Sequence, residues 1–274
     1  NIRIRERLTS HKIIEECMLL ANVSVAKYIS KIKANCLYRV HETPNLQKIE
    51  QLRSVLKLFS IELTGGTEPK TKDFSELLTA ISDREDCNFL QKIILRTQQQ
   101  ARYIAENSGH FGLGYDNYTH FTSPIRRYPD LVVHRTLKYI LDKQNDCGYH
   151  YTKTQVESIS EHCSVMERNA EKASREAIDR LKCEFMRDKV GNSYHGTIVE
   201  VTNFGIFVEI DAFYIQGLVH ITALKNDYYI FDDASLKLIG KNSGVVYQIG
   251  GEVIILVDNV NIDQRKIDFS LNDE

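Results

Sequence analysis

Apolar residues recur every three or four positions through most of the first 190 residues, a spacing typical of helices that bury one face. The first helix is expected to begin at Thr9 or Ser10, whose hydroxyl can cap it. Its predicted inward face carries Ile14, Cys17, Ala21, Val25, Tyr28 and Ile32. A second helix is expected to open at Thr43-Pro44, with Pro in its first position and Gly65-Gly66 beyond its end. Its predicted inward face consists of Leu46, Ile49, Leu52, Leu56 and Phe59.

Three further segments show helical spacing. A short helix is expected around Leu77, Leu78 and Ile81, and a longer one with Phe89, Ile93, Ile94, Thr97 and Ala101 on one side. Thr152 and Gln155 match a capping box, from which helical spacing continues almost to Gly191. The buried side of this last helix is predicted to hold Val156, Ile159, Cys163, Ala170, Ala173, Ala177, Leu181 and Phe185.

From Asn192 onward the pattern changes to alternation of apolar and polar residues, which predicts β-strands. Five short β-rich runs are expected to form strands: 197–201, 206–210, 217–221, 253–257 and 266–271. Five strands in about 80 residues suit a small closed barrel of the OB type. The predicted fold class is therefore α+β, with a mainly helical domain over 1–190 and an OB-fold barrel over 191–274.

Charge divides the chain at the same point. Residues 1–190 carry 30 basic and 25 acidic side chains, a net charge of +5, whereas residues 191–274 carry 5 basic and 12 acidic ones, a net charge of −7. The acidic barrel lacks the basic surface that strong binding to a nucleic-acid backbone requires. We expect it to guide a strand toward the basic helical half rather than to bind tightly alone.

Other features of composition narrow the class of protein. No run approaches the ~18 apolar residues of a membrane-spanning helix, and no secretory leader is evident. The six cysteines contain no C-x-x-C pair, so reduced thiols are expected rather than disulfides or a zinc site. These observations predict a cytoplasmic protein with no membrane partner.

The segment 109–131 is rich in Gly, His and aromatic residues and has no clear period, which is typical of a functional loop. Ser123-Pro124 resembles a helix start, and it places Arg126 and Arg127 in the first turn, with Pro129 stopping or kinking that turn before a helix over 130–143. The inward side of that helix is expected to hold Val133, Leu137, Ile140 and Leu141. Cations are unfavourable at a helix N-terminus unless an anion such as phosphate completes the site. Alternatively, both arginines bend outward or pair with a carboxylate such as Asp130.

Two motifs carry a resemblance to a known family. His110-Phe-Gly-Leu-Gly114 is followed by Tyr118-Thr-His-Phe-Thr-Ser-Pro-Ile-Arg-Arg-Tyr-Pro-Asp-Leu-Val-Val-His-Arg135. Together with Ala21-Asn22 and Asn226-Asp-Tyr-Tyr229, they resemble the ribonuclease II/R family of 3′→5′ exoribonucleases. The resemblance runs essentially from end to end.

The resemblance implies roles for individual residues. It implies that Arg126 holds a phosphate near the scissile bond and that Glu15 lies near the 3′-terminal nucleotide. From the residues alone, the preferred interpretation of Glu15 is a solvated carboxylate that favours a helix N-terminus. Arg127, Tyr128, His110 and His120 are expected to line an RNA channel, or to be packed, hydrogen-bonded loop residues.

The aspartate-rich motif that forms the family's metal site is not found in this sequence. By resemblance, Mg²⁺ is bound by an aspartate-rich motif upstream of the region seen here. Two-metal hydrolysis needs clustered carboxylates, and residues 1–190 show no such cluster. We therefore expect the complete enzyme to bind Mg²⁺ through ligands that lie mostly outside this chain. We name no metal-ligating residue here and expect no small-molecule cofactor.

The barrel resembles the OB-fold RNA-binding domain first named from a ribosomal small-subunit protein. The resemblance implies that Phe204, Phe207 and His220 contact bases and that Arg265 or Lys266 meets phosphate. Gly205 is expected to permit a bulge, and one of the two Phe residues is expected to belong to the barrel core.

Three hypotheses of function follow. The first is a fragment of a processive, Mg²⁺-dependent exoribonuclease that releases nucleoside 5′-monophosphates and is inactive alone. The second is a non-catalytic single-stranded RNA-binding protein. In the third, the piece remains associated with its own N-terminal half in a nicked enzyme.

Overall fold

The computed structural model describes residues 7–84, 86–142, 150–224, 227–232 and 237–272. These residues form two compact units: the first comprises residues 7–84 and 90–170, and the second comprises residues 86–89 and 171–272. One boundary therefore falls within a long helix, between Ala170 and Glu171. Position 143, the expected end of the helix over 130–143, and Asn226 lie outside the described residues, as does Cys147, one of the six cysteines. Within the described part of the chain, no helix is both long and apolar enough to span a membrane.

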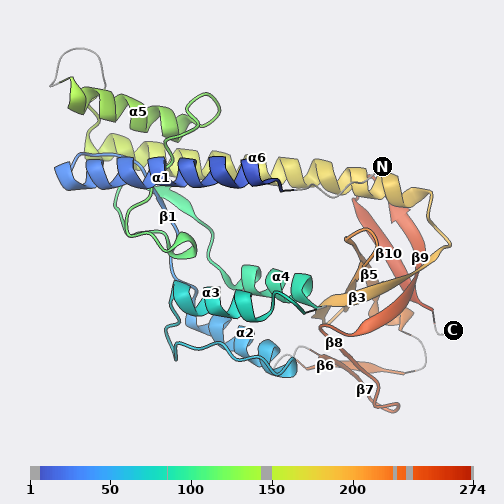
Figure 1. Ribbon diagram of the computed structural model, residues 1–274. Coiled ribbons are helices and arrows are strands. Elements are labelled where there is room, and N and C mark those ends of the chain that lie inside the picture. The colour runs from blue at the N-terminus through green and yellow to red at the C-terminus, as the bar shows by residue number, and fades with distance from the viewer. Residues whose placement is uncertain (1–6, 85, 143–149, 225–226, 233–236, 273–274) are drawn as a thin grey trace. The chain divides into compact units, whose positions relative to one another are not determined.

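The first unit is mainly helical. Its helices are α1 (Thr9–Ile32), α2 (Leu46–Leu58), α3 (Thr71–Ala80), most of α4 (Cys87–Thr97), α5 (Tyr128–Leu141) and the start of α6 (Lys153–Arg187). A two-stranded antiparallel sheet pairs β1 (Tyr38–Val40) with β2 (Arg102–Ile104), and a short 3₁₀ helix, η1, spans Phe111–Leu113. Figure 1 shows α1 running beside the first half of α6, and the core between α1, α5 and α6 is formed by Ala26, Ile29, Val132, Val133 and Val156.

The inward face of α1 differs from the prediction by a rotation of the helix. Its buried residues are Asn22, Val23, Ala26 and Ile29, whereas Ile14 is 59% exposed and Cys17, Tyr28 and Ile32 are also exposed. The helix is capped at Leu8 rather than at Thr9 or Ser10. The prediction followed large apolar residues, but the buried face carries a polar Asn and a small Ala.

The predictions for the other helices were right in part. Ile49, Leu52 and Leu56 of α2 are buried as expected, but Asn45 caps this helix and Thr43-Pro44 precedes it. In α5, Val133 is buried, whereas the expected Leu141 is exposed. The capping box of α6 is confirmed, since Thr152 and Gln155 exchange hydrogen bonds. The residues of α6 that were expected inward but are exposed are Ala170, Ala173, Ala177 and Leu181.

The second unit contains the predicted barrel, which is confirmed. Five strands close in the order β10-β5-β4-β3-β9, with bounds β3 (Ser193–Thr202), β4 (Gly205–Ile210), β5 (Ile215–His220), β9 (Glu252–Asn261) and β10 (Lys266–Leu271). The 3₁₀ helix η2 covers Ile221–Ala223. Ile206, Val208, Val219, Ile255 and Phe269 fill the interior, and Cys183 and Met186 at the end of α6 join the same core.

An insertion between β5 and β9 forms a separate three-stranded sheet. Its strands are β6 (Tyr229–Asp232), β7 (Lys237–Gly240) and β8 (Val246–Gln248), paired antiparallel in chain order. One face, with Tyr229 and Leu238, belongs to the barrel core, so the insertion is attached by apolar packing.

Candidate nucleic-acid interface

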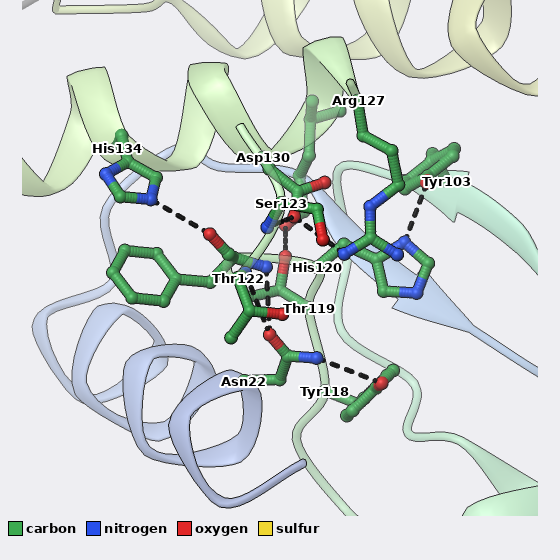
Figure 2. Close-up of polar contacts among 12 residues, drawn as sticks. Asn22, Tyr103, Tyr118, Thr119, His120, Thr122, Ser123, Arg127, Asp130 and His134 are labelled. Atoms are coloured by element: carbon green, nitrogen blue, oxygen red, sulfur yellow. Dashed lines mark hydrogen bonds and ion pairs between the residues drawn. The ribbon is translucent and has the colours of Figure 1, made fainter. Parts of the chain in front are cut away.

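The segment 109–131 of the helical unit, the aromatic loop, is held in place by a buried asparagine. Asn22 of α1 is 3% exposed, and its Nδ2 donates to the Tyr118 hydroxyl at 3.1 Å. Its Oδ1 accepts from the backbone N–H groups of Phe121 at 3.0 Å and Thr122 at 3.3 Å (Figure 2). The side chain therefore satisfies backbone donors that a loop cannot satisfy by itself. The sequence signal for this role was a polar residue on the small-residue face of an apolar helix.

The Ser123-Pro124 segment forms a turn and not the expected helix start. The backbone N–H groups of Arg126 and Arg127 both donate to the Ser123 carbonyl, at 3.3 and 3.0 Å, and α5 begins only at Tyr128. Pro129 falls inside the first turn of α5, where a missing N–H is tolerated. The expectation that both arginines occupy a first helical turn was therefore wrong, because the helix starts after them.

Asp130 fixes this turn from within. Its side chain is fully buried, and Oδ1 accepts from the backbone N–H of Ser123 and from the Arg127 guanidinium, both at 2.8 Å (Figure 2). Arg127 retains 21% side-chain exposure. For Arg127, the alternative interpretation of pairing with Asp130 is the one observed.

Arg126 differs from its neighbour. It is exposed, and its side chain makes no hydrogen bond or ion pair with any residue within the described ranges. A guanidinium presented on a pinned turn without a carboxylate partner is available to a phosphate, which it can bind through two parallel hydrogen bonds.

A third arginine lies close to the same loop. Arg39 on β1 is 14% exposed, pairs with Glu167 of α6 and stacks over the Tyr103 ring at 4.7 Å. Tyr103 is itself tied to α6 by two hydrogen bonds between its backbone and the Ser164 hydroxyl. The sequence offered no signal for Arg39, because the ion pair joins residues 128 positions apart.

A continuous series of aromatic rings and imidazoles runs from His41 to His120. His41 stacks on His110 at 5.1 Å, His110 meets the edge of Tyr118 at 5.1 Å, and Tyr118 meets His120 at 5.8 Å. The Tyr103 hydroxyl lies 2.7 Å from Nδ1 of His120. His110 and His120 thus make contacts within the loop, and both remain partly exposed. A place along the path of an RNA strand stays a prediction for both.

The histidines in this series are held neutral. Burial, followed by the charges of Arg127 and Arg39, lowers the pKa of His120 to about 3. Burial, followed by the neighbouring His41, lowers the pKa of His110 to about 4. Positive charge near this loop is therefore concentrated on the arginines.

Two other predicted residues are more exposed. Tyr128, the first residue of α5, is half exposed. Glu15 lies on the exposed N-terminal half of α1, and its carboxylate accepts from Arg7 Nε at 3.1 Å. It stands seven residues, or about 10 Å along the helix axis, before Asn22.

The barrel presents its own aromatic cluster. Phe204 is 44% exposed, its ring lies 6.0 Å from that of Phe207, and neither residue belongs to the buried core. The expectation that one of them fills the core was wrong, because Ile206 and Val208 point inward on either side of Phe207. His220 lies across from Gly205 in the β4–β5 pairing, which places it on the same face of the two strands as Phe207.

Gly205 has a different role from the expected bulge. Its φ is 151°, and a Cβ there would lie 2.3 Å from the Val219 carbonyl. Glycine is required for the close approach of β4 and β5. The register shift lies in the β3–β4 pairing, between Ile198 and Glu200.

Arg265 and Lys266 stand apart from this cluster. Because Asp268 pairs with Leu218 in the parallel β5–β10 ladder, Lys266 is about four residues, or roughly 13 Å, from the level of His220. Arg265 has its guanidinium 3.8 Å from Glu176 of α6, whereas Lys266 has no ion pair with any residue that the structure describes.

The carboxylates present do not fit the Mg²⁺ site that the family resemblance implies. Among the described residues, no three His, Cys, Asp or Glu side chains are grouped so as to hold a metal ion. Asp130, the buried carboxylate of the loop, already binds Arg127 and the Ser123 N–H through one oxygen. No step of chemistry is therefore assigned to a metal held by this chain.

A helical unit whose aromatic loop carries two arginines, followed by an OB barrel with exposed aromatic rings, defines a protein of the nucleic-acid-binding class. The RNB domain family matches residues 1–143, and the S1 RNA binding domain family matches residues 187–272. The chain belongs to the RNB family. Within that family it corresponds to the C-terminal RNB and S1 regions of ribonuclease R, which confirms the resemblance found in the sequence.

Three relatives illustrate the match. Ribonuclease R of Escherichia coli (strain K12) is 47% identical over 97% of this chain, which spans only 34% of that protein's length. Mycoplasma genitalium RNase R, solved in complex with ribose-methylated single-stranded RNA, is 28% identical with a TM-score of 0.92, over 98% of this chain and 42% of that one. Yeast Ssd1, described as a pseudonuclease, is 25% identical with a TM-score of 0.72, over 85% of this chain and 29% of that one.

Proposed function

We propose that this chain is the strand-binding part of a cytoplasmic 3′→5′ exoribonuclease that hydrolyses single-stranded RNA to nucleoside 5′-monophosphates. The observation that carries the proposal is the contrast between two adjacent arginines. Arg127 is neutralised by the buried Asp130, while Arg126 is exposed and has no side-chain partner within the described residues. Such an arrangement supports one arginine as a structural anchor and the other as a phosphate ligand.

The chemistry of phosphodiester cleavage gives Arg126 a specific role. Attack of water on the terminal phosphate adds negative charge to its non-bridging oxygens. The turn holds the backbone of Arg126 in place, and its guanidinium, unpaired among the described residues, would stabilise that charge by hydrogen bonds to those oxygens. Glu15, near the exposed start of α1, would contact the 3′-terminal nucleotide, and Arg127, Tyr128 and His110 would line the path of the strand.

The barrel supplies the second part of the proposal. Phe204, Phe207 and His220 would stack on or contact bases, and Arg265 or Lys266 would meet phosphates. Base stacking on aromatic rings tolerates any sequence, as a processive enzyme requires. We place the functional division at residues 1–190 and 191–274, where the net charge changes from +5 to −7 and the first barrel strand follows.

The Mg²⁺ required for hydrolysis would be bound by carboxylates outside this chain. The chain alone is therefore proposed to be inactive, and to act only together with the remainder of the enzyme, in one polypeptide or as a nicked assembly with its N-terminal half. A second candidate is a non-catalytic single-stranded RNA-binding protein. The similarity to Ssd1 favours this candidate, because a protein described as a pseudonuclease shares the fold.

A gel assay tests the proposal. The 274-residue chain is incubated with 5′-labelled single-stranded RNA and Mg²⁺, and a mobility-shift lane is run in parallel. We expect a shifted complex without any shortening of the RNA. Shortening from the 3′ end by a preparation free of other chains would contradict the proposed inactivity, and absence of a shift would contradict RNA binding. Adding the upstream portion, or expressing the longer reading frame, should restore cleavage for the exonuclease and not for the non-catalytic protein.

A further inference from the structure

A cavity of about 680 Å³ lies in the helical unit, and its lining includes none of Arg39, Arg126 and Arg127. It is formed by the start of α2, by residues 67–71 and by Phe111 of η1. Its apolar lining consists of Pro44, Leu46, Ile49, Pro69 and Phe111. This volume falls within the range of small-ligand sites, about 300–1,000 Å³.

The walls of the cavity are held by contacts that need no ligand. Asp73 accepts from the Lys70 backbone N–H at 2.6 Å and from the Thr64 hydroxyl at 2.8 Å, which fixes the segment before α3. The Thr71 hydroxyl donates to the Phe111 carbonyl at 2.7 Å and joins that segment to the aromatic loop. The Phe111 ring is also packed edge-on against Phe74 at 5.7 Å. A preformed cavity of this kind costs little ordering on binding.

The polar groups at the cavity have complementary chemistry. Glu68 and Lys70 both line it, both are exposed, and neither side chain makes a hydrogen bond or ion pair within the part of the chain that the structure describes. A carboxylate accepts hydrogen bonds from the N–H groups at the edge of a nucleobase. An ammonium group binds phosphate as a point charge. Apolar and aromatic walls accommodate a flat ring.

We propose that this cavity binds one ribonucleotide, with its base against Phe111 and Pro44, its N–H edge at Glu68 and its phosphate at Lys70. The proposal rests on the proposed function, because RNA supplies the nucleotide, either as one unit of the bound strand or as the released 5′-monophosphate. A series of ring contacts connects Phe111, at the cavity, to His120, nearer the arginines in the sequence of the aromatic loop. From Phe111 the steps to His41, His110, Tyr118 and His120 measure 5.1 to 6.2 Å.

The test begins with free nucleotide. Guanosine 5′-monophosphate and guanosine are titrated into the full chain while backbone amide NMR shifts are followed. We expect shifts at residues 67–71 and around Phe111, with at least tenfold weaker binding of the nucleoside. Thr67→Trp fills the cavity from an exposed loop position and should reduce binding of both ligands at least tenfold. Ser75→Trp, on the exposed side of α3, is the matched control and should bind as the parent chain does.

A second variant provides an independent test in case Thr67→Trp does not fold. Lys70→Met should abolish the preference for the monophosphate and leave the binding of guanosine unchanged. Thermal melting by circular dichroism checks that each variant is folded. If the parent, Thr67→Trp and Lys70→Met chains bound guanosine 5′-monophosphate with equal affinity, the lining assigned to the site would be overturned.

Binding of a single-stranded oligonucleotide then separates the two sources of the nucleotide. If Thr67→Trp weakens oligonucleotide binding, the occupant is a unit of the strand. If it weakens only monophosphate binding, the occupant is the released product. If it weakens neither, the proposal is overturned while the proposed function stands. Failure of the parent chain to bind the oligonucleotide at all counts against the proposed function, and the monophosphate titration still decides the cavity.

Discussion

Arg126 and Arg127 show how two identical side chains in sequence acquire different roles from one turn. Both backbone N–H groups bind the Ser123 carbonyl, so the two residues are fixed on the same turn. Only Arg127 reaches the buried Asp130. Motif reasoning identified the pair, and the difference between them depends on where α5 begins. The Ser-Pro signal placed that start four residues too early, with the cap at Ser123 instead of Arg127.

Replacing Arg126 tests its role in the reaction. In the longer enzyme, Arg126→Ala should lower kcat by about 10²–10³-fold, as loss of one transition-state charge donor does, and leave RNA affinity nearly unchanged. Single-turnover cleavage and anisotropy binding measure the two effects separately. Arg126→Lys keeps the charge without the planar fork and should give an intermediate rate. Equal losses of affinity and rate would assign Arg126 to ground-state binding instead.

The neutral histidines make a prediction about pH. Burial and the charges of Arg127 and Arg39 lower the pKa of His120 to about 3 in the folded chain, against about 6.5 in an unfolded one. Between those values the unfolded chain binds more protons, so the free energy of unfolding decreases as the pH falls from about 6.5 toward 3. Above pH 6.5 His120 is neutral in both states, so the stability contributed by the neutral histidine is fully present.

A variant isolates that contribution. His120→Asn keeps an oxygen that can accept from the Tyr103 hydroxyl but does not titrate. It should reduce the slope of unfolding free energy against pH by up to about 1.4 kcal/mol per pH unit between pH 6 and 4, measured by urea denaturation. His162→Asn, on an exposed face of α6, is the control and should keep the parent slope. An unchanged slope in His120→Asn would mean that this histidine is protonated in the folded chain.

At the scale of elements, the barrel was predictable because its alternation is dense and its interior is apolar. Strands β3, β4, β5, β9 and β10 occupy the five predicted runs. The helices were predicted as elements, but their orientation was not. In α1 the exposed Ile14 is as apolar as the buried Ile29, and only tertiary contact with α5 and α6 selects the face.

The candidate site shows the same limit. A local motif located Arg126, and the family resemblance marked Asn22 without indicating its partners. Arg39 and Tyr103 come from distant elements and carry no local signal. The contacts of Asn22, Arg39 and Tyr103 to the loop or to α6 span 61 to 128 residues of sequence. Spacing along the chain describes neighbours within a helix or strand, and cannot describe partners that only the fold brings together.

The β4–β5 edge of the barrel carries its own prediction. Phe204→Ala combined with Phe207→Ala should weaken binding of a labelled single-stranded RNA by roughly 10- to 100-fold, since each stacked base contributes about 1–3 kcal/mol. Cleavage of short substrates already engaged by the longer enzyme should be spared. Tyr228→Ala removes another exposed aromatic ring of the same unit and serves as the control. Unchanged anisotropy titrations for the double variant would make the stacking assignment wrong.

For the molecule as a whole, the two net charges divide the work of binding RNA. The +5 of residues 1–190 favours phosphate, while the −7 of residues 191–274 opposes it, so the barrel must bind mainly through its rings. The two mechanisms respond differently to salt, because only phosphate contacts release counterions. A plot of log Kobs against log salt concentration therefore separates them.

Lys266 provides the sharpest case. It makes no ion pair within the described residues, so Lys266→Gln should reduce the salt slope for single-stranded RNA by about 0.7, the value for one phosphate contact. Arg265→Gln should reduce it by less, because its guanidinium already lies near Glu176. The Phe204 and Phe207 double variant should lower the affinity at every salt concentration and leave the slope unchanged. Lys241→Gln, at another exposed lysine of the unit, is the control and should alter neither the affinity nor the slope. If Lys266→Gln kept the parent slope, the strand would not pass this end of β10, and the phosphate contacts of the chain would lie with Arg126 on the helical unit.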